Sequence, residues 1–538
     1  MTTLTAKLEE TVREYMARSH VAGLALALVK DGELVAAEGF GVANIDTGEK
    51  IAPDTRFSIM SVTKTITSTA VMQLRDRGLL GLDEPVNKYI APARITNEWE
   101  AESPVTMRQL LTHTGGLPVG PYLSTEKLPL AEFVNRFART VYRPGTDMIY
   151  ANWGFDAAGV LISNLSGHPV DDFLRESIFE PLGMTASALA LPDDRAPRAW
   201  GHYYSALDGR LRRGPPFDWP TIPPTPAGGV WSNVLDLSKF LVAHLTGGGG
   251  ILSATSIAEM HRVHARQGNC DSGQGIGFRV TRVNGRHTFL HGGDDGFTAF
   301  LAGQPEANVG VAMLMNTGGM QAARSVIGNS ALAALAPPER RTFAAAAPVT
   351  PGLYKSTFWE IEVEAREDTL TAVPGFVLAE EPAASALHSS GGGVEAEGGM
   401  FHGFELAFEG DRIYGGVYPF TFVRAGDITP PLPIDPDAEL TGNWAGSVST
   451  PIGPMAATLR ITHQTALTVD TPFAQNITAS NVEALAGRVE GEFAITVPGI
   501  GEMQLFLRLE ARGGKLTGKT YARAAMGEVP LSTELARV

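Results

Sequence analysis

The sequence predicts an α+β fold: an antiparallel sheet flanked by helices, followed by two small antiparallel β-barrels. First, residues 23–30 and 33–40 are apolar, strand-like runs joined by Asp31-Gly32, a dipeptide typical of tight hairpins. Second, residues 288–300 and 309–315 supply further strands that complete an antiparallel set with this hairpin. Third, helical patterns nearly vanish after residue 350, where alternating strands and glycine turns take over.

Two proline-containing breaks set the predicted domain boundaries. An Ala/Pro linker follows residue 336, and a second proline-rich break lies at 429–436. At 538 residues the chain is too long for a single core. We therefore expect a first domain over 1–336 and β-barrel domains over 350–428 and 438–538.

The most informative element is the segment 57–74, which the pattern predicts as a short extended stretch followed by a long buried helix. Ser61 falls in the first turn, and Lys64, three residues later, shares its face of the helix. A serine hydroxyl becomes nucleophilic when a base takes its proton, and a lysine whose pKa is lowered by burial can do this. The helix N-terminus adds N–H groups that stabilise developing negative charge. The S-x-x-K pattern alone is common by chance.

A second polar stretch, Tyr150-Ala151-Asn152, precedes a predicted helix at 155–165. A tyrosine hydroxyl beside a lysine ammonium is easier to ionise and can relay a proton. Asn152 can donate and accept hydrogen bonds at once, which suits it to hold a substrate carbonyl or the lysine head. Taken alone, the stretch fits a core aromatic residue and a helix cap better.

A third stretch, His291-Gly292-Gly293, lies between two strand-like runs and is followed by Asp294 and Asp295. Glycines at a strand edge let a substrate backbone come close. A histidine with an ordinary pKa of about 6.5 is mostly neutral at pH 7, so it binds a carboxylate poorly. The stretch therefore favours an ammonium or uncharged substrate. Alternatively, both aspartates are solvent-facing turn residues.

The remaining histidines and the single cysteine predict no metal site. His113 lies in the stretch 106–117, an apolar turn of helix that ends in a Gly115-Gly116 loop, where a buried helix-end histidine bonded to the backbone is favoured over a functional one. His261 and His264 lack nearby carboxylates or cysteines and are expected on the surface of a helix. Cys270 is expected to be a loop or core thiol. We expect no metal and no organic cofactor.

Composition and charge exclude several classes of protein. The net charge of −15 at pH 7 argues against nucleic acid as a partner. No run of about 18 uncharged apolar residues is present, so no membrane span is expected. The N-terminus lacks the basic start and apolar run of a secretory signal. We expect a cytoplasmic protein. The sequence does not determine its oligomeric state, and a homo-oligomer is one of the open alternatives.

Together, S-x-x-K at 61–64, Y-x-N at 150–152 and H-x-G at 291–293 resemble the penicillin-recognising serine hydrolases. More narrowly, the chain is similar to the branch of class C β-lactamases, D-aminopeptidases and β-lactamase-like esterases. The phrases LLTHTGGLP, PG-x4-YAN, IFEPLGM and PAGGVWSNVLDL extend the resemblance over most of residues 10–335. The resemblance implies a β-lactamase-like catalytic domain with an additional all-helical subdomain. Gly115 departs from the family pattern, in which serine is common.

The resemblance also implies roles for the reacting residues. Ser61 would be the acylated nucleophile, and Lys64 and Tyr150 would form the proton-transfer pair. Which of the two is the base stays open, because strongly coupled groups titrate as a unit. Asn152 would position the substrate.

Two further roles concern the third motif. The backbone N–H groups of Ser61 and Asp294 would form the oxyanion hole. His291 would stand where β-lactamases use a lysine, whose ammonium binds the carboxylate of penicillins. His291, Gly293, Asp294 and Asp295 are thus the expected substrate-binding residues of this motif.

These expectations converge on a serine hydrolase that cleaves an amide or ester through an acyl-enzyme on Ser61. D-aminopeptidase-like hydrolysis of a small-molecule or short-peptide substrate is favoured. A catalytic domain with two barrels resembles the three-domain D-aminopeptidases, in which a barrel loop helps to close the site; here the stretch 389–393 is a candidate only by its expected flexibility. The alternatives are a β-lactamase-like carboxylesterase, a penicillin-binding sensor whose acyl-enzyme persists, and a binding protein with vestigial catalysis.

Overall fold

The computed structural model describes most of the first 339 residues and a series of strand segments beyond them. These are residues 4–117, 128–146, 148–191, 196–205, 210–213, 225–266, 272–294, 296–339, 351–355, 360–366, 369–375, 384–389, 394–409, 412–415, 421–424, 442–450, 453–461, 467–471, 474–478, 480–485, 488–497, 501–512, 515–524 and 527–537. The chain forms two compact units, of which the first contains Met1–Gly120, Leu128–Asp218 and Pro223–Asp427, and the second contains Ile428–Val538.

The first unit is built on an eight-stranded sheet with the strand order β2-β1-β12-β11-β10-β9-β8-β7. The N-terminal hairpin turns at Asp31 and Gly32, whose φ angles of 53° and 80° are those that a tight type I′ turn requires. The predicted antiparallel set is confirmed, because β1 pairs with both β2 and β12. The strands are β1 (Gly23–Lys30), β2 (Glu33–Gly41), β7 (Ala265–Arg266), β8 (Gly273–Gln274), β9 (Arg279–Val283), β10 (Arg286–Asp294), β11 (Thr298–Gln304) and β12 (Val309–Met315).

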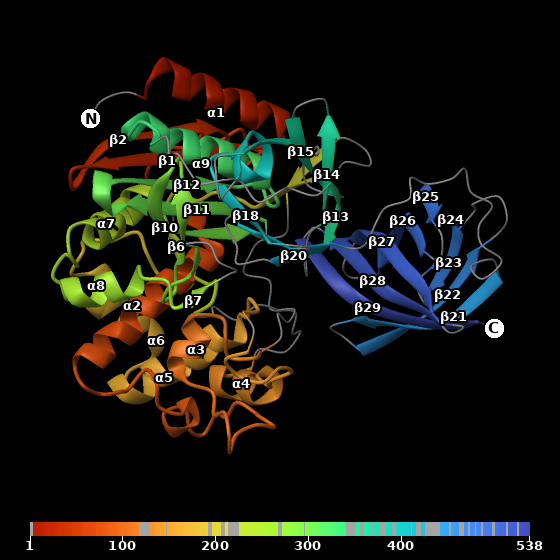
Figure 1. Cartoon of the computed structure of the whole chain (residues 1–538), viewed down its shortest axis with the longest axis horizontal. Helices are drawn as coiled ribbons and strands as arrows, with labels where there is room; N and C mark the ends of the chain where they lie inside the picture. Colours follow the sequence, from red (N-terminus) through yellow and green to blue (C-terminus); the bar gives the residue numbers. More distant parts are fainter. Residues whose placement is uncertain are drawn as a thin grey trace. The chain divides into compact units, whose positions relative to one another are not determined.

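Helices cover both faces of this sheet. Helices α1 (Ala6–Arg18) and α9 (Gln321–Leu335) lie over one face, and α7 (Val234–Leu245) lies against the other (Figure 1). Small residues allow the close packing: Gly328 of α9 faces Phe300, and Gly310 of β12 faces Leu241 of α7. Every residue of β12 is consequently buried, as expected of a strand between two helical layers.

A group of short helices lies beyond the sheet (orange in Figure 1). It contains α3 (Met107–Leu111), α4 (Leu130–Phe137), α5 (Trp153–Ser166) and α6 (Val170–Leu174). Helix α2 (Thr63–Asp76) contacts α5 and α6, and all its residues from Thr63 to Leu74 are buried. The predicted long buried helix is therefore confirmed. Helix α8 (Ala254–Met260) follows α7 in the chain.

The structure contradicts the predicted surface position of His261. Helix α8 ends at Met260, so His261 occupies the C-cap and its ring turns into the core. It stacks on Phe289 with ring centroids 3.7 Å apart, and its Nε2 lies 3.1 Å from Nδ1 of His244. His264 lies past the helix end and is half-buried against Arg108.

Eight further strands of the first unit close into a barrel. They are β13 (Gly352–Lys355), β14 (Glu360–Arg366), β15 (Thr369–Gly375), β16 (Ser385–Ser389), β17 (Val394–Glu397), β18 (Glu405–Glu409), β19 (Arg412–Tyr414) and β20 (Thr421–Arg424). Hydrogen bonds join the barrel to α9: the Ser325 hydroxyl donates to the Met400 carbonyl at 2.7 Å, and the Asn329 amide donates to the His402 carbonyl at 2.6 Å.

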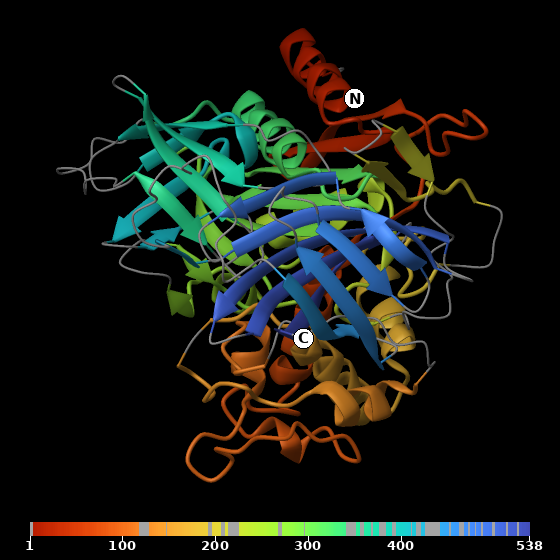
Figure 2. The ribbon, with the colours of Figure 1, turned by 90° about the vertical axis from the view of Figure 1, so that its right-hand side faces the viewer.

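The second unit is a twisted nine-stranded antiparallel sheet (blue in Figure 2). Its strand order is β24-β23-β22-β21-β29-β28-β27-β26-β25, and among the described residues no pairing joins its two end strands. The second predicted barrel is therefore not confirmed. The strands are β21 (Gly442–Thr450), β22 (Gly453–Ile461), β23 (Leu467–Thr471), β24 (Ala474–Thr478), β25 (Ser480–Leu485), β26 (Arg488–Val497), β27 (Gly501–Arg512), β28 (Lys515–Ala524) and β29 (Gly527–Arg537). Within the described part of the chain, no helix has the length and apolar character of a membrane span.

Candidate active site

Ser61 lies where a short strand turns into the buried helix α2. Strand β3 (Phe57–Ser58) leads to a 3₁₀ turn at Met60–Val62, from which α2 continues. Met60 has a φ of 48°, a left-handed conformation that is uncommon outside glycine and is concentrated at functional sites. This turn leaves Ser61 partly exposed at the N-terminal end of a helix that is otherwise buried.

Lys64 is fully buried beside this serine. Its Nζ lies 2.9 Å from Ser61 Oγ and donates to the Ala227 carbonyl at 2.7 Å. Burial lowers the pKa of Lys64 to about 7, because removing the ammonium from water penalises its charged form. The negative charge of Asp156 on α5 opposes this shift. Near neutral pH, Lys64 can therefore exist both as an amine that accepts a proton and as an ammonium that returns it.

Tyr150 and Asn152 lie beside the lysine at the start of α5. Lys64 Nζ is 4.9 Å from the centroid of the Tyr150 ring and 5.5 Å from that of Phe155. Asn152 occupies the N-cap position of α5, yet its side chain makes no capping hydrogen bond. Its buried Oδ1 has no hydrogen-bond partner among the described residues. The helix-cap interpretation therefore does not account for this side chain, whereas an external polar partner would.

The end of strand β10 packs directly against the turn that carries Ser61. A side chain at Gly293 would have its Cβ 2.6 Å from the Ile59 carbonyl oxygen and 3.1 Å from the Ser61 nitrogen. Only glycine fits at this distance without displacing backbone atoms. Gly293 thus allows the third motif to approach the Ser61 N–H.

His291 is buried at the same place and is uncharged. Burial and the charge of Lys64 lower the pKa of His291 to about 3. Its Nδ1 lies 2.6 Å from the Gly292 carbonyl, so Nδ1 carries the proton and Nε2 remains an acceptor. The imidazole can accept a hydrogen bond but offers no positive charge to a carboxylate.

The side chain of Asp294 fits neither of the expectations for it. It is not a solvent-facing turn residue, because its carboxylate accepts from the Gly319 N–H at 2.6 Å and contacts Gln321 at the start of α9. Arg324 lies 3.9 Å away. Since these groups already engage the carboxylate, the backbone of Asp294 is better placed than its side chain for a role in the site. Asp295 lies outside the described residues.

A family model described as Beta-lactamase matches residues 8–335, which is more than half of the chain. The chain belongs to this family. The resemblance to the penicillin-recognising serine hydrolases is thereby confirmed. The match covers α1 through α9 and includes all three motifs.

Proteins similar to this chain have names that point to different functions. Penicillin-binding protein 4 from Amycolatopsis lactamdurans is 32% identical over 317 residues, covering 56% of this chain and 82% of that protein. The octameric penicillin-binding protein homologue from Pyrococcus abyssi has 26% identity and a TM-score of 0.55, covering 78% of this chain and 99% of that one. The D-amino acid amidase from Ochrobactrum anthropi has 26% identity and a TM-score of 0.50, covering 59% and 92%. The chain spans 62% of the length of Protein flp from Staphylococcus aureus, a relative with 22% identity.

Two groups that contact Lys64 or act on its charge were not among the predicted site residues. The Ala227 carbonyl carries no side-chain signal and depends on a remote loop folding over α2. Asp156 does carry a signal: it is a buried acid in the first turn of the largely apolar helix α5, one turn after Asn152. A buried carboxylate of this kind commonly marks a charged partner.

Proposed function

We propose that this β-lactamase-family protein is a serine hydrolase that cleaves an amide or ester through an acyl-enzyme on Ser61. The supporting observation is the contact between Ser61 Oγ and a lysine whose pKa lies near 7. A lysine with its ordinary pKa of about 10.4 would be protonated at neutral pH and could not act as a base. Burial without an ion pair gives Lys64 that ability.

The proposed reaction gives each group of the site a defined role in both acylation and deacylation. The Lys64 and Tyr150 pair takes the proton of Ser61, and Oγ attacks the substrate carbonyl carbon. Backbone N–H groups of Ser61 and Asp294 stabilise the oxyanion. The carbonyl then re-forms, the bond to the leaving group breaks, and the pair returns the proton to that group. Water attacks the acyl-enzyme by the same route and restores Ser61.

The uncharged third motif favours substrates without a carboxylate at that position. Because His291 offers an acceptor, it would pair with an N–H or O–H donor of the substrate. This supports amide hydrolysis of the D-aminopeptidase type, and one structural neighbour is a D-amino acid amidase. Asn152 Oδ1 would accept from the substrate amide.

Two alternatives keep specific support. A carboxylesterase fits an uncharged site equally well, because an ester oxygen needs less protonation on leaving. A penicillin-binding sensor is suggested by a relative named as a penicillin-binding protein. Self-association is a further proposal, because one structural neighbour is octameric; light scattering of the purified protein would measure it.

Steady-state hydrolysis of a matched set of substrates separates these functions. The set contains the p-nitroanilides of D- and L-alanine, p-nitrophenyl butyrate and nitrocefin, each tested with the wild type and with Ser61→Ala. We expect cleavage of the D-anilide to be preferred and to disappear in the variant. Activity confined to the ester would identify a carboxylesterase, and stoichiometric acylation without turnover would identify a sensor. Activity that persists in Ser61→Ala would refute the mechanism.

A further inference from the structure

His113 binds the backbone N–H groups of the two residues that neighbour Tyr150 in the chain. The Ile149 N–H donates to the His113 carbonyl at 2.8 Å, and the Ala151 N–H donates to His113 Nδ1 at 3.1 Å. One residue therefore holds the backbone N–H groups of the residues immediately before and after the tyrosine. The first of these bonds uses only the backbone, but the second requires an acceptor atom on the side chain.

The ring of His113 also contacts the tyrosine directly. Its centroid lies 4.4 Å from that of Tyr150 and 5.4 Å from that of Phe155, the two aromatic rings that flank Lys64. His113 is only 2% exposed. Because Nδ1 accepts a hydrogen bond, the proton of the neutral ring is on Nε2. An uncharged ring adds no positive charge beside Lys64.

The backbone of His113 indicates that this geometry is imposed. Its φ is 57°, in the left-handed region that is uncommon for residues other than glycine, although histidine adopts it more often than most, as asparagine and aspartate do. Such conformations persist where the surrounding structure holds them in place. Here the residue directly follows α3 and Thr112, and the Thr112 hydroxyl donates to the Arg108 carbonyl at 2.8 Å.

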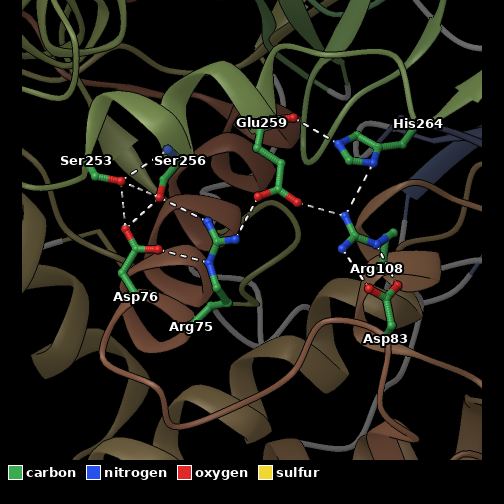
Figure 3. Close-up of polar contacts among 8 residues, drawn as sticks. All are labelled: Arg75, Asp76, Asp83, Arg108, Ser253, Ser256, Glu259 and His264. Atoms are coloured by element: carbon green, nitrogen blue, oxygen red, sulfur yellow. Dashed lines mark hydrogen bonds and ion pairs between the residues drawn. The ribbon is translucent and has the colours of Figure 1, made fainter.

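Helix α3 is itself anchored by its arginine (Figure 3). Arg108 donates to both carboxylate oxygens of Asp83, at 2.6 and 2.8 Å, and to Glu259 of α8 at 3.0 Å. Glu259 in turn accepts from Arg75 of α2 at 2.7 Å. The helix that delivers His113 is thus tied to α2, the helix that carries Lys64.

We propose that His113 is a positioning residue that holds Tyr150 in the orientation needed for proton transfer with Lys64. This inference rests on the proposed function of Ser61, Lys64 and Tyr150. Loss of the Nδ1 acceptor would release the Ala151 amide and let the tyrosine shift. A displacement of a proton-transfer group by about 1 Å can lower the reaction rate by about 10²-fold.

Two substitutions at this position separate the acceptor from the backbone conformation. Glycine and asparagine both tolerate a positive φ, but only asparagine keeps an acceptor, Oδ1, close to the place of Nδ1. Both remove the ring, so His113→Gly and His113→Asn differ mainly in the bond to the Ala151 N–H. Melting temperatures of both variants report folding independently of activity.

The readout is the ratio of anilide to ester hydrolysis, measured on the substrate set given above. An anilide nitrogen must be protonated to leave, whereas p-nitrophenolate leaves without a proton, so a displaced Tyr150 harms the anilide more. We expect His113→Gly to lower kcat on the anilide by about 10²-fold and on the ester by less than about tenfold. His113→Asn should recover most of this loss. Adding His113→Gly to Tyr150→Phe should cause no further loss on the anilide, because residues that act through one another are not additive.

Equal losses on both substrates, or a double-variant loss equal to the product of the single losses, would overturn the proposal. If His113→Gly does not fold, ¹⁵N NMR of the wild-type histidines still decides, with the His113 signals assigned by their absence from His113→Asn. A neutral ring protonated at Nε2 is expected, and an Nδ1-protonated ring would contradict the bond to Ala151. Turnover that survives in Ser61→Ala refutes the proposed function itself, whereas Ser61-dependent turnover unaltered by His113→Gly refutes only the role of His113.

Discussion

Helix α2 carries two basic side chains in opposite electrostatic surroundings, one in the candidate site and one in the network of Figure 3. Arg75, near the end of α2, is 2.7 Å from Glu259 and 2.9 Å from Asp76. Lys64, near the start of α2, has no ion pair among the described residues and is fully buried. Burial alone would raise the pKa of Glu259, but its hydrogen bonds to Arg108 and Arg75 outweigh this and lower it. Ion pairing therefore keeps the side chains of the network charged, whereas burial without an ion pair lowers the pKa of Lys64 to near neutral pH.

Replacing Lys64 and Arg75 by methionine is expected to show the largest difference between the two sites. We expect Lys64→Met to lower kcat/KM by about 10²–10⁴-fold, because it removes a proton-transfer group. Its stability should stay the same or rise, since a buried amine is replaced by an apolar chain. Arg75→Met should instead lower the free energy of unfolding, by about 1–2 kcal/mol, because the pair it breaks is partly buried. Substrate kinetics and urea unfolding of both variants measure the two effects, and a large loss of stability in Lys64→Met would contradict the contrast.

Buried histidines should make the first unit sensitive to acid. Burial lowers the pKa values of His113, His244, His261 and His291, those of His244 and His291 to about 3. In the unfolded chain these rings protonate below about pH 6.5. As pH falls below that value, the unfolded state therefore binds protons that the folded state does not, and each ring costs about 1.4 kcal/mol of stability per pH unit.

Urea unfolding between pH 7 and pH 5 measures this loss. His261→Phe should reduce the pH dependence, because phenylalanine keeps the stack on Phe289 without a titratable nitrogen. A slope identical to that of the wild type would show that His261 does not remain neutral in the folded state.

The pH dependence of hydrolysis tests the basicity of Lys64. We expect kcat/KM to rise with pH and to level off above an apparent pKa of about 7, because the reactive form of Lys64 is the neutral amine. Asp156→Asn removes a negative charge that raises the pKa of Lys64, so the rising limb should move to lower pH. A shift of the rising limb to higher pH would contradict its assignment to the Lys64 and Tyr150 pair.

The smallest effect is expected at the exposed edge of the network. Asp83 is 72% exposed where it pairs with Arg108, whereas Glu259 is 18% exposed. Asp83→Asn should lower the free energy of unfolding by less than about 1 kcal/mol, and salt should reduce the difference further. Glu259→Gln should cost more, because it removes the partly buried negative charge that two arginines share. Equal losses of unfolding free energy in the two variants would show that solvent exposure does not determine how much these ion pairs stabilise the fold.

Local signals predicted most of the fold around the site. The Asp31-Gly32 hairpin, the buried helix after Ser61 and the strands near residues 290 and 310 are all recognisable from short stretches of chain. Short stretches of sequence cannot show whether the last sheet closes into a barrel, because closure depends on pairing between strands β24 and β25 at opposite ends of the sheet. His261 was misplaced because one residue decides whether a side chain continues a helix face or turns into the core.

The motif residues were likewise identifiable, but their surroundings were not. Ser61 and Lys64 are close because of their spacing on a helix, whereas the carboxylate of Asp294 is engaged by Gly319 and Gln321, which belong to a different element. His113 was set aside because a histidine at a helix end is ordinarily structural. Only the fold shows that its Nδ1 and its carbonyl accept from the N–H groups of Ala151 and Ile149, the residues on either side of Tyr150.

Rapid quenching of p-nitrophenyl butyrate turnover, followed by intact-protein and peptide mass spectrometry, tests the central claim most directly. The account predicts a wild-type species heavier by one butyryl group, located on the peptide that contains Ser61, and formed faster as pH rises through about 7. Ser61→Ala should show no such species. Acylation at another residue, or turnover without any acylated Ser61, would contradict the account.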